Sequence, residues 1–203
     1  LEHKVSHGEL YGKTVGIIGY GWAATAHIDA INASGMAQVT RIYSSHLLDD
    51  DELSTRHGSR IKSTTNLNAM LKDPNLDVVD VTSYPYQHAD QVVAAAKAGK
   101  HIIIEKPITL TQPGLRRIVA AVKKARVKVC VCFECRFASQ FLTIKSVVDQ
   151  GLVGKIHYGE VDYYHGVGPW YGQYRWNTKK DAGGSSLLSA GCHAMDALLY
   201  FMG

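Results

Sequence analysis

The chain has 203 residues, 46% of them hydrophobic and 20% charged, with a formal net charge of +4. That length holds one full domain and part of a second, and the mild, scattered positive charge argues against a nucleic-acid-binding protein. No apolar run approaches the roughly 20 residues of a membrane helix, so we expect no membrane partner.

The N-terminus and the cysteines bear on the compartment. The first residues, Leu1 to Lys4, carry neither an apolar signal-peptide core nor an initiator methionine, so we expect a piece of a longer protein. Cys130, Cys132 and Cys135 are close in sequence, but no CxxC pair recurs elsewhere, so we expect neither a disulfide framework nor a metal site. Free thiols indicate a reducing compartment and therefore a cytoplasmic protein.

Residues 10–134 alternate short apolar runs with helical stretches. We expect strands at 13–18, 38–43, 77–82, 101–104 and 127–133, and helices at 22–33, 66–71, 89–98 and 115–125. Short buried strands that alternate with helices at this spacing predict an α/β fold, a doubly wound and mostly parallel Rossmann sheet. Right-handed crossovers then bring ligand-binding loops to the carboxyl ends of the strands.

The pattern changes in residues 135–203, which we expect to begin a second, α+β substrate domain. Helices are predicted at 142–150 and 185–202, and a strand with one exposed face at 156–164, where apolar and polar residues alternate. Because a single half-buried strand needs partners, we interpret this part as an incomplete domain.

A glycine motif of the form G-x-G-x-x-A lies directly after the first predicted strand and opens the first helix. Gly19 permits a tight turn, Gly21 lets the backbone approach a diphosphate, and Ala24 lets the helix pack closely on the strand. The helix N-terminus adds amide donors and a positive dipole end. In this context the motif predicts a dinucleotide site rather than a plain strand-to-helix turn. The predicted cofactor-binding residues of this loop are Gly19, Tyr20, Gly21, Trp22, Ala23 and Ala24.

The end of the second strand bears on the choice between NAD and NADP. An Asp or Glu at this place binds the ribose 2′-hydroxyl of NAD, but this chain has Ser44, Ser45 and His46 there, with Arg41 inside the strand. The missing carboxylate removes the repulsion of a 2′-phosphate, which hydroxyl and imidazole groups can bind, so we favour NADP slightly over NAD. Alternatively, the serines only cap a loop.

Glu105, Lys106 and Pro107 close the strand at 101–104. A lysine at the carboxyl end of a central strand faces the crevice that holds a nicotinamide ring, where its ammonium can donate to a substrate hydroxyl and stabilise alkoxide character. Pro107 restricts Lys106 to an extended conformation. We therefore expect Glu105 and Lys106 to bind cofactor, and Lys106 also to bind substrate and act in catalysis. Without its neighbours, Lys106 would be read as an exposed lysine at a strand end.

The predicted helix at 185–202 carries Ser189, His193 and Asp196, spaced four and three residues apart and therefore on one face. A histidine there can act as a general base towards a substrate hydroxyl at neutral pH. A lone helical histidine is more often structural, but the nicotinamide site elsewhere in the chain favours catalysis. We expect His193 to be catalytic, and both His193 and Ser189 to contact substrate.

The loop at 170–176 is rich in aromatic residues and holds one arginine. Aromatic faces stack on the C–H surfaces of sugars, and an arginine fork binds hydroxyls or a carboxylate. Trp170, Arg175 and Trp176 are therefore candidate substrate contacts, although a hydrophobic plug against the first domain fits the loop equally well.

These ordered motifs resemble those of the Gfo/Idh/MocA oxidoreductases, a family that includes glucose–fructose oxidoreductase and inositol dehydrogenase. The resemblance covers nearly the whole chain and implies a Rossmann domain followed by an open, mostly antiparallel sheet. It also implies hydride transfer between NAD(P) and a sugar, a cyclitol or a related alcohol, in a homo-oligomer of the complete protein. Lys106 and His193 match the catalytic lysine and histidine of the family.

Two further segments resemble family motifs. Residues 83–88 are similar to a loop that lies along the cofactor, which implies cofactor contacts for Ser83, Pro85 and His88. Arg136 and Phe137 resemble an Arg-Phe pair that borders the substrate site, which implies a substrate contact for Arg136.

The chain also departs from the family pattern. Ser189 stands where many members have an aspartate, Ser83 and Tyr84 replace the usual Thr-Pro, and the chain stops at Gly203, directly after the catalytic helix. The first departure implies an altered proton relay or a different substrate class. A non-catalytic NAD(P)-binding sensor or regulator on the same fold is the alternative function.

Overall fold

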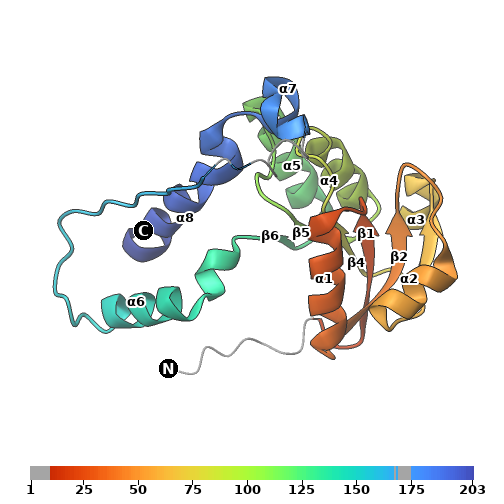
Figure 1. The fold of residues 1–203 in the computed structure, drawn as a ribbon, viewed down its shortest axis with the longest axis horizontal. Coiled ribbons are helices and arrows are strands. Elements are labelled where there is room, and N and C mark those ends of the chain that lie inside the picture. Colours follow the sequence, from red (N-terminus) through yellow and green to blue (C-terminus); the bar gives the residue numbers. More distant parts are fainter. Residues whose placement is uncertain (1–9, 167, 169–174) are drawn as a thin grey trace. The chain divides into compact units, whose positions relative to one another are not determined.

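The structure is a computed structural model that describes residues 10–166, 168 and 175–203 (Figure 1). The chain forms two compact units, Leu1–Val131 and Cys132–Gly203. Among the described residues, no helix is both long and apolar enough to cross a membrane.

Six parallel strands form the sheet of the first unit, in the order β3-β2-β1-β4-β5-β6 (Figure 1). The strands are β1 (Lys13–Ile18), β2 (Ala37–Tyr43), β3 (Lys62–Thr64), β4 (Val78–Val81), β5 (His101–Ile104) and β6 (Val129–Val131). This strand order is that of a Rossmann fold and confirms the predicted doubly wound sheet. The order reverses between β1 and β4, so the loops after these two strands diverge at the carboxyl edge, where such sheets bind ligands.

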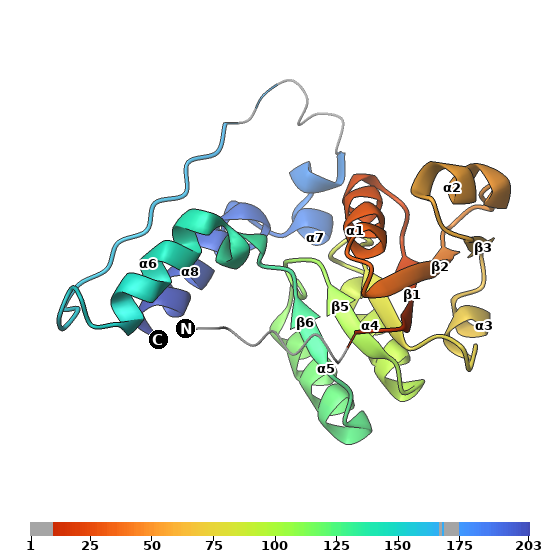
Figure 2. The same ribbon diagram turned by 90° about the horizontal axis from the view of Figure 1, so that it is seen from below.

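Helices cover both faces of this sheet (Figure 2). They are α1 (Trp22–Ala33), α2 (Asp50–His57), α3 (Leu67–Leu71), α4 (His88–Lys97) and α5 (Gln112–Ala125). Successive residues of a strand point to opposite faces, so β1 contributes to two cores. Ile17 packs with Ile28 of α1 and Leu53 of α2, whereas Ile18 packs in the cluster that holds Val92 of α4 and Ile118 of α5.

The predicted strands and helices of the first unit agree with the structure within a few residues, and α1 has the predicted bounds. Asn66 is the N-cap of α3, where its side chain accepts a hydrogen bond from the Ala69 amide. Gly99 follows α4 with a φ of +74°, in the left-handed conformation that ends helices. Strand β3 was not predicted, because its three residues are polar and only the pairing with β2 makes them a strand. Helix α2 was wrongly predicted as a polar loop at 49–52, because nearly all its residues are polar, but Asp49 caps a helix there.

The regular secondary structure in the described part of the second unit is all helical. It contains η1 (Glu134–Phe137), α6 (Ser139–Asp149), η3 (Arg175–Thr178), α7 (Lys180–Gly183), η4 (Leu187–Gly191) and α8 (Cys192–Met202). The strand predicted at 156–164 is wrong: this segment forms no strand, because no described residue of the unit offers it a hydrogen-bonding partner strand. The helix predicted at 185–202 is interrupted, since η4 is a π-helical turn ahead of α8.

Candidate nucleotide-binding and active site

The glycine loop connects β1 to α1 and has the properties that a diphosphate site needs. Gly19 has a φ of +94°, and a Cβ atom there would lie 2.8 Å from the Ser83 Cα atom, so only glycine fits. At Gly21 a Cβ would meet nothing within 4 Å, so the approach to the backbone is open. Gly21 is the N-cap of α1, without a side-chain cap and without acidic residues in the first turn. The first amides of α1 are therefore available to an anion.

His88 ties together two of the loops that the sequence assigns to the cofactor. Its Nδ1 atom lies 2.9 Å from the Pro107 carbonyl oxygen, and its Nε2 atom lies 3.0 Å from the Ser83 carbonyl oxygen. Burial lowers the pKa of His88, although both carbonyls favour the charged ring. The imidazole is fully buried and Pro85 of the first loop is buried as well, so His88 fixes the loops after β4 and β5.

A second buried histidine supports the glycine loop from α2, and sequence reasoning missed it. The Tyr20 hydroxyl lies 3.0 Å from His57 Nε2, and His57 Nδ1 lies 2.7 Å from an Asp29 carboxylate oxygen. Burial raises the pKa of Tyr20, opposed by the charge of Arg56. These contacts hold the side chain of Tyr20, which is the residue between the two glycines of the G-x-G motif. Only the packing of α2 against α1 brings these residues together, so the sequence held no signal for them.

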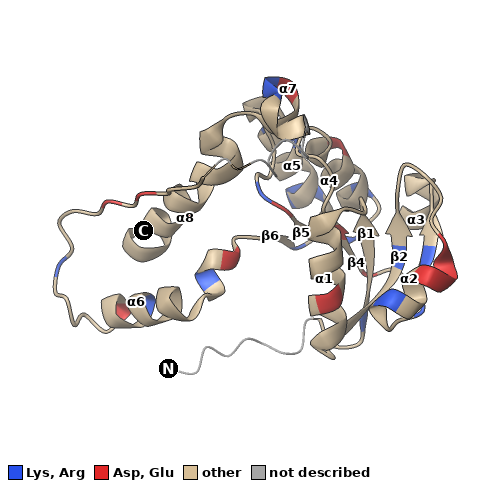
Figure 3. Ribbon diagram, in the orientation of Figure 1, with Lys and Arg blue, Asp and Glu red and all other residues tan. Residues whose placement is uncertain are grey.

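The end of β2 offers hydroxyl and imidazole groups but no carboxylate. Ser44 is buried, and its hydroxyl is 3.5 Å from the His46 amide. Ser45 and His46 are exposed, with 3.4 Å between the Ser45 hydroxyl and His46 Nδ1. Arg41 does not face this site, because it pairs with Asp73 at 2.9 Å. The next acidic residues along the chain are Asp49, the N-cap of α2, and three in the first turn of that helix (Figure 3).

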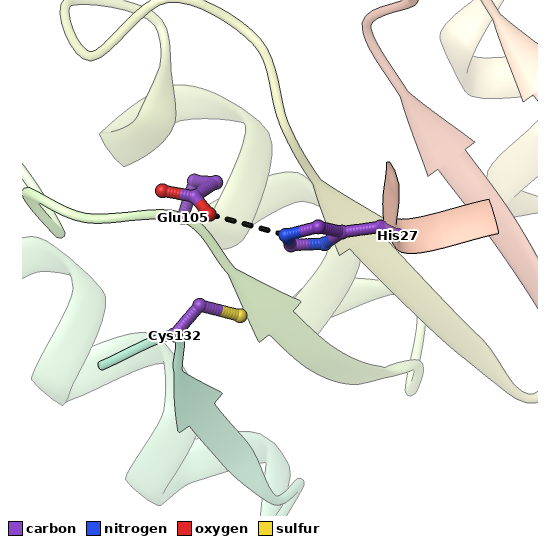
Figure 4. Close-up of side chains that lie close together, drawn as sticks. All are labelled: His27, Glu105 and Cys132. Atoms are coloured by element: carbon purple, nitrogen blue, oxygen red, sulfur yellow. Dashed lines mark hydrogen bonds and ion pairs between the residues drawn. The ribbon is translucent and has the colours of Figure 1, made fainter. Parts of the chain in front are cut away.

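Lys106 follows β5 in a turn that its neighbour Glu105 organises. The Lys106 amide donates to one Glu105 carboxylate oxygen at 3.0 Å, and the other oxygen lies 3.1 Å from His27 Nε2. Figure 4 shows His27, from α1, facing Glu105. Burial raises the pKa of Glu105, but the hydrogen bond and charge of His27 outweigh this effect and hold the pKa below its usual range.

In the second unit, His193 lies on α8 within an aromatic environment. Its ring stacks on Tyr163 with 5.8 Å between centroids and meets Phe133 edge-on at 6.0 Å. The side chain is only 5% exposed, and its Nε2 atom lies 3.7 Å from a carboxylate oxygen of Glu134, which is itself mostly exposed. The ring is therefore held in a fixed orientation, with an acidic group beside Nε2.

Arg136 and Asp196, both singled out from the sequence, bind each other. The Arg136 guanidinium makes a bidentate ion pair with the Asp196 carboxylate at 2.7 and 2.5 Å and lies 5.1 Å from the centre of the Tyr200 ring. Asp196 is thus the internal partner of Arg136. The predicted substrate contact of Arg136 stays a prediction.

Ser189 lies within the π-helical turn that precedes α8, whereas His193 lies on α8 itself. Ser189 lines an open pocket of about 450 Å³ together with Tyr163, His165 and Met195. Of the predicted aromatic loop, Trp170 lies outside the described residues, as does the side chain of Arg175. Trp176 lies in η3 and is half-buried.

One group in this unit has side chains of the metal-binding type. Glu134, Cys135 and His193 each offer a ligand atom, all within 4.8 Å of one another. However, Glu134 lies against Nε2 of the imidazole, whereas Cys135 Sγ lies 3.9 Å from Nδ1. Because one metal ion binds one nitrogen of an imidazole, this arrangement fits hydrogen bonding to the ring better than a shared metal ion.

Comparisons with known proteins place these features in a family. The family model described as an oxidoreductase family with an NAD-binding Rossmann fold matches residues 13–133, and the model of a GFO/IDH/MocA C-terminal domain matches residues 141–203. The chain is 32% identical over 146 residues to myo-inositol 2-dehydrogenase of Thermotoga maritima, covering 70% of this chain and 42% of the relative. It is 28% identical over 190 residues to scyllo-inositol 2-dehydrogenase (NADP(+)) of Bacillus subtilis, covering 93% of this chain and 51% of the relative.

A solved structure shows the same likeness. Levoglucosan dehydrogenase in complex with NADH and levoglucosan superposes with a TM-score of 0.79 at 27% identity, over 94% of this chain and 54% of that one. The chain spans about half the length of the curated relatives it matches. Together with the glycine loop at the switch point of the sheet, the two family models show that the chain belongs to the GFO/IDH/MocA family of oxidoreductases.

Proposed function

We propose that the complete protein transfers a hydride between NAD(P) and a hydroxylated small molecule, such as a sugar or a cyclitol. The observation that carries this proposal is the placement of the open glycine loop and of Lys106 at the same edge of one parallel sheet. The names of relatives that act on inositols and levoglucosan support this substrate class.

The residues of the first unit fit a dinucleotide. The uncapped N-terminus of α1 and the bare backbone at Gly21 would hold the diphosphate, since a side chain there would fill the approach. Ser45 and His46 would bind the adenosine ribose and its 2′-phosphate, which supports a slight preference for NADP. Ser83 packs against Gly19, so its loop would border the same cofactor.

Two side chains would perform the proton chemistry. When bound, the nicotinamide supplies the hydride acceptor. The Lys106 ammonium would donate a hydrogen bond to the substrate hydroxyl oxygen and stabilise its negative charge as the C–H bond breaks. His193 would take the hydroxyl proton at a ring nitrogen, and the Glu134 carboxylate, 3.7 Å from Nε2, would stabilise the resulting imidazolium. The alcohol carbon thereby becomes a carbonyl.

The test measures turnover by the full-length protein with NAD⁺ or NADP⁺ and a panel of cyclitols, aldoses and anhydrosugars. The absorbance of the reduced cofactor reports the rate. Lys106→Ala and His193→Ala should each lower kcat by about 10²–10⁴-fold, the usual contribution of a positioned acid or base. Lys97→Ala and His157→Ala change exposed residues of the same types in the same two units and serve as controls.

The outcomes separate an enzyme from a sensor. If the protein binds NADPH but no alcohol or ketone is turned over, and binding survives both substitutions, the protein is a non-catalytic NAD(P)-binding regulator. If neither nucleotide binds, the assignment of the glycine loop is wrong.

We further propose a cytoplasmic protein that forms homo-oligomers. None of the four cysteines forms a disulfide bond within the described part of the chain, which supports a reducing compartment. Exposed apolar side chains such as Leu152, Val153 and Leu199 in the second unit support a contact surface there. Sedimentation of the full-length protein would measure the oligomeric state.

A further inference from the structure

A buried carboxylate interrupts the most apolar strand of the sheet. All four residues of β4 are buried, and three of them are valines, but the third residue is Asp80, which is fully buried. Its Oδ2 atom lies 2.7 Å from His27 Nδ1, whereas Oδ1 has no hydrogen-bond partner among the described residues. A buried charge of this kind is strongly unfavourable without an opposite charge, so its presence in a central strand calls for a function.

His27 supplies the opposite charge. The ring bridges two carboxylates, with Nδ1 facing Asp80 and Nε2 facing Glu105 at 3.1 Å. A neutral imidazole has a single N–H and can donate to only one of them, so with both carboxyl groups ionised the two bonds require the imidazolium. Burial lowers the pKa of His27, but the hydrogen bonds and charges of Asp80 and Glu105 outweigh this effect and raise it to about 10.

The chain of contacts ends at the turn that carries Lys106. One Glu105 oxygen accepts from His27, and the other accepts from the Lys106 amide at 3.0 Å. The Glu105 amide itself donates to the Val81 carbonyl oxygen at 2.9 Å, which continues the pairing of β5 with β4. The Glu105 side chain is therefore held at both oxygens, and it fixes the first peptide beyond the sheet.

The alternating charges also reach the lysine side chain. The positive charge of Lys106 acts on the Glu105 carboxylate and lowers its pKa. Along the path from Asp80 to Lys106 the charges thus run negative, positive, negative, positive, and the cluster is neutral overall. Buried ionic clusters are seldom more stable than apolar ones of the same size, so stability alone is a weak reason for this one.

We propose that His27 and Asp80 are positioning residues for Lys106, acting through the Glu105 carboxylate to hold the turn on which the lysine is presented to substrate. This inference rests on the proposed function for the role of Lys106, but the charge state of His27 and the order of the turn can be measured without turnover.

The experiment uses the full-length protein with the variants Asp80→Asn and His27→Gln. Asp77→Asn is the matched control, because Asp77 precedes the same strand at the opposite edge of the sheet, where it pairs with Lys13. In ¹⁵N NMR spectra at pH 8, both ring nitrogens of His27 should be protonated in the wild type and in Asp77→Asn, and no longer in Asp80→Asn. A neutral His27 in the wild type would overturn the proposal.

Hydrogen exchange then reports on the turn. The Lys106 amide should exchange at least tenfold faster in Asp80→Asn and His27→Gln than in the wild type, while the Glu105 amide, which is bonded to β4, should keep its rate. Unchanged exchange at Lys106 in both variants would show that the cluster does not order the turn, whether or not the protein is an enzyme.

Turnover measurements on the same variants distinguish a positioning role of His27 and Asp80 from a purely structural one. Both variants should lower kcat at least tenfold and leave KM and the Kd for NADPH within about twofold of the wild type. In the double variant His27→Leu/Asp80→Leu the buried charges are replaced by apolar groups, which should restore thermal stability but not kcat. If this double variant turns over at the wild-type rate, the cluster is merely structural and the proposal fails.

Discussion

The two glycines of the loop after β1 separate the stability of the fold from cofactor binding, and alanine at each position tests this directly. At Gly19, alanine would adopt a φ of +94° and place its Cβ 2.8 Å from the Ser83 Cα and 2.9 Å from the Ser83 nitrogen. The left-handed conformation costs about 1–2 kcal/mol and forced overpacking about 1–3 kcal/mol, so Gly19→Ala should lower the free energy of unfolding by roughly 2–5 kcal/mol.

Gly21 differs in both respects. Its φ of −133° and ψ of −164° suit any residue, and its Cβ would meet nothing within 4 Å. Reduced entropy of the unfolded chain favours alanine by about 0.4–1 kcal/mol, and the weaker helix N-cap opposes it by a similar amount, so the stability of Gly21→Ala should stay within about 1 kcal/mol of the wild type. The new methyl group would nevertheless stand where a diphosphate must approach the backbone.

The assay combines urea unfolding with titration of NADPH fluorescence in the full-length protein. Gly21→Ala should unfold at the wild-type urea concentration yet bind NADPH at least tenfold more weakly, a loss of about 1.4 kcal/mol of binding free energy. If Gly21→Ala binds NADPH as tightly as the wild type, the glycine loop does not hold the diphosphate and our reasoning is refuted.

Three further predictions concern stability. Because the pKa of His27 rises from 6.5 to about 10 on folding, its contribution is fully present below pH 6.5 and is lost as the pH rises through the folded value. The free energy of unfolding should therefore fall by roughly 1.4 kcal/mol per pH unit between about pH 7 and pH 9.5, and urea unfolding of His27→Gln should lack this slope. The Thr111 hydroxyl caps α5 by accepting from the Gly114 amide at 3.2 Å; Thr111→Ala should cost about 1 kcal/mol in chemical unfolding and Thr111→Ser much less. Asp196→Ala removes the bidentate ion pair with Arg136, and because Arg136 is 40% exposed the cost should be about 1–3 kcal/mol, below that of a fully buried pair; an unchanged melting temperature would show that this pair does not stabilise the second unit.

In parts of the second unit, the local sequence pattern did not predict the secondary structure correctly. Alternation in residues 156–164 satisfies the period of a strand, but a strand exists only through hydrogen bonds to a neighbour, and the described residues of the unit supply none. Similarly, the four- and three-residue spacing of Ser189, His193 and Asp196 assumes an uninterrupted α-helix. The π-helical turn at 187–191 breaks that assumption, so Ser189 lines the open pocket whereas His193 is buried.

The sequence by itself determined the Rossmann architecture, the glycine loop and the position of Lys106 after β5, because each depends on short-range features: apolar runs of strand length, glycines at a fixed spacing and a proline after the lysine. Tertiary structure alone decided the partners of His27, Asp80 and His57. His27 and Asp80 are 53 residues apart in the sequence, and Tyr20 and His57 are 37 residues apart. Only the packing of α1 and α2 on the sheet brings such distant groups within hydrogen-bonding distance. The periodicity of the sequence gives no indication of these contacts.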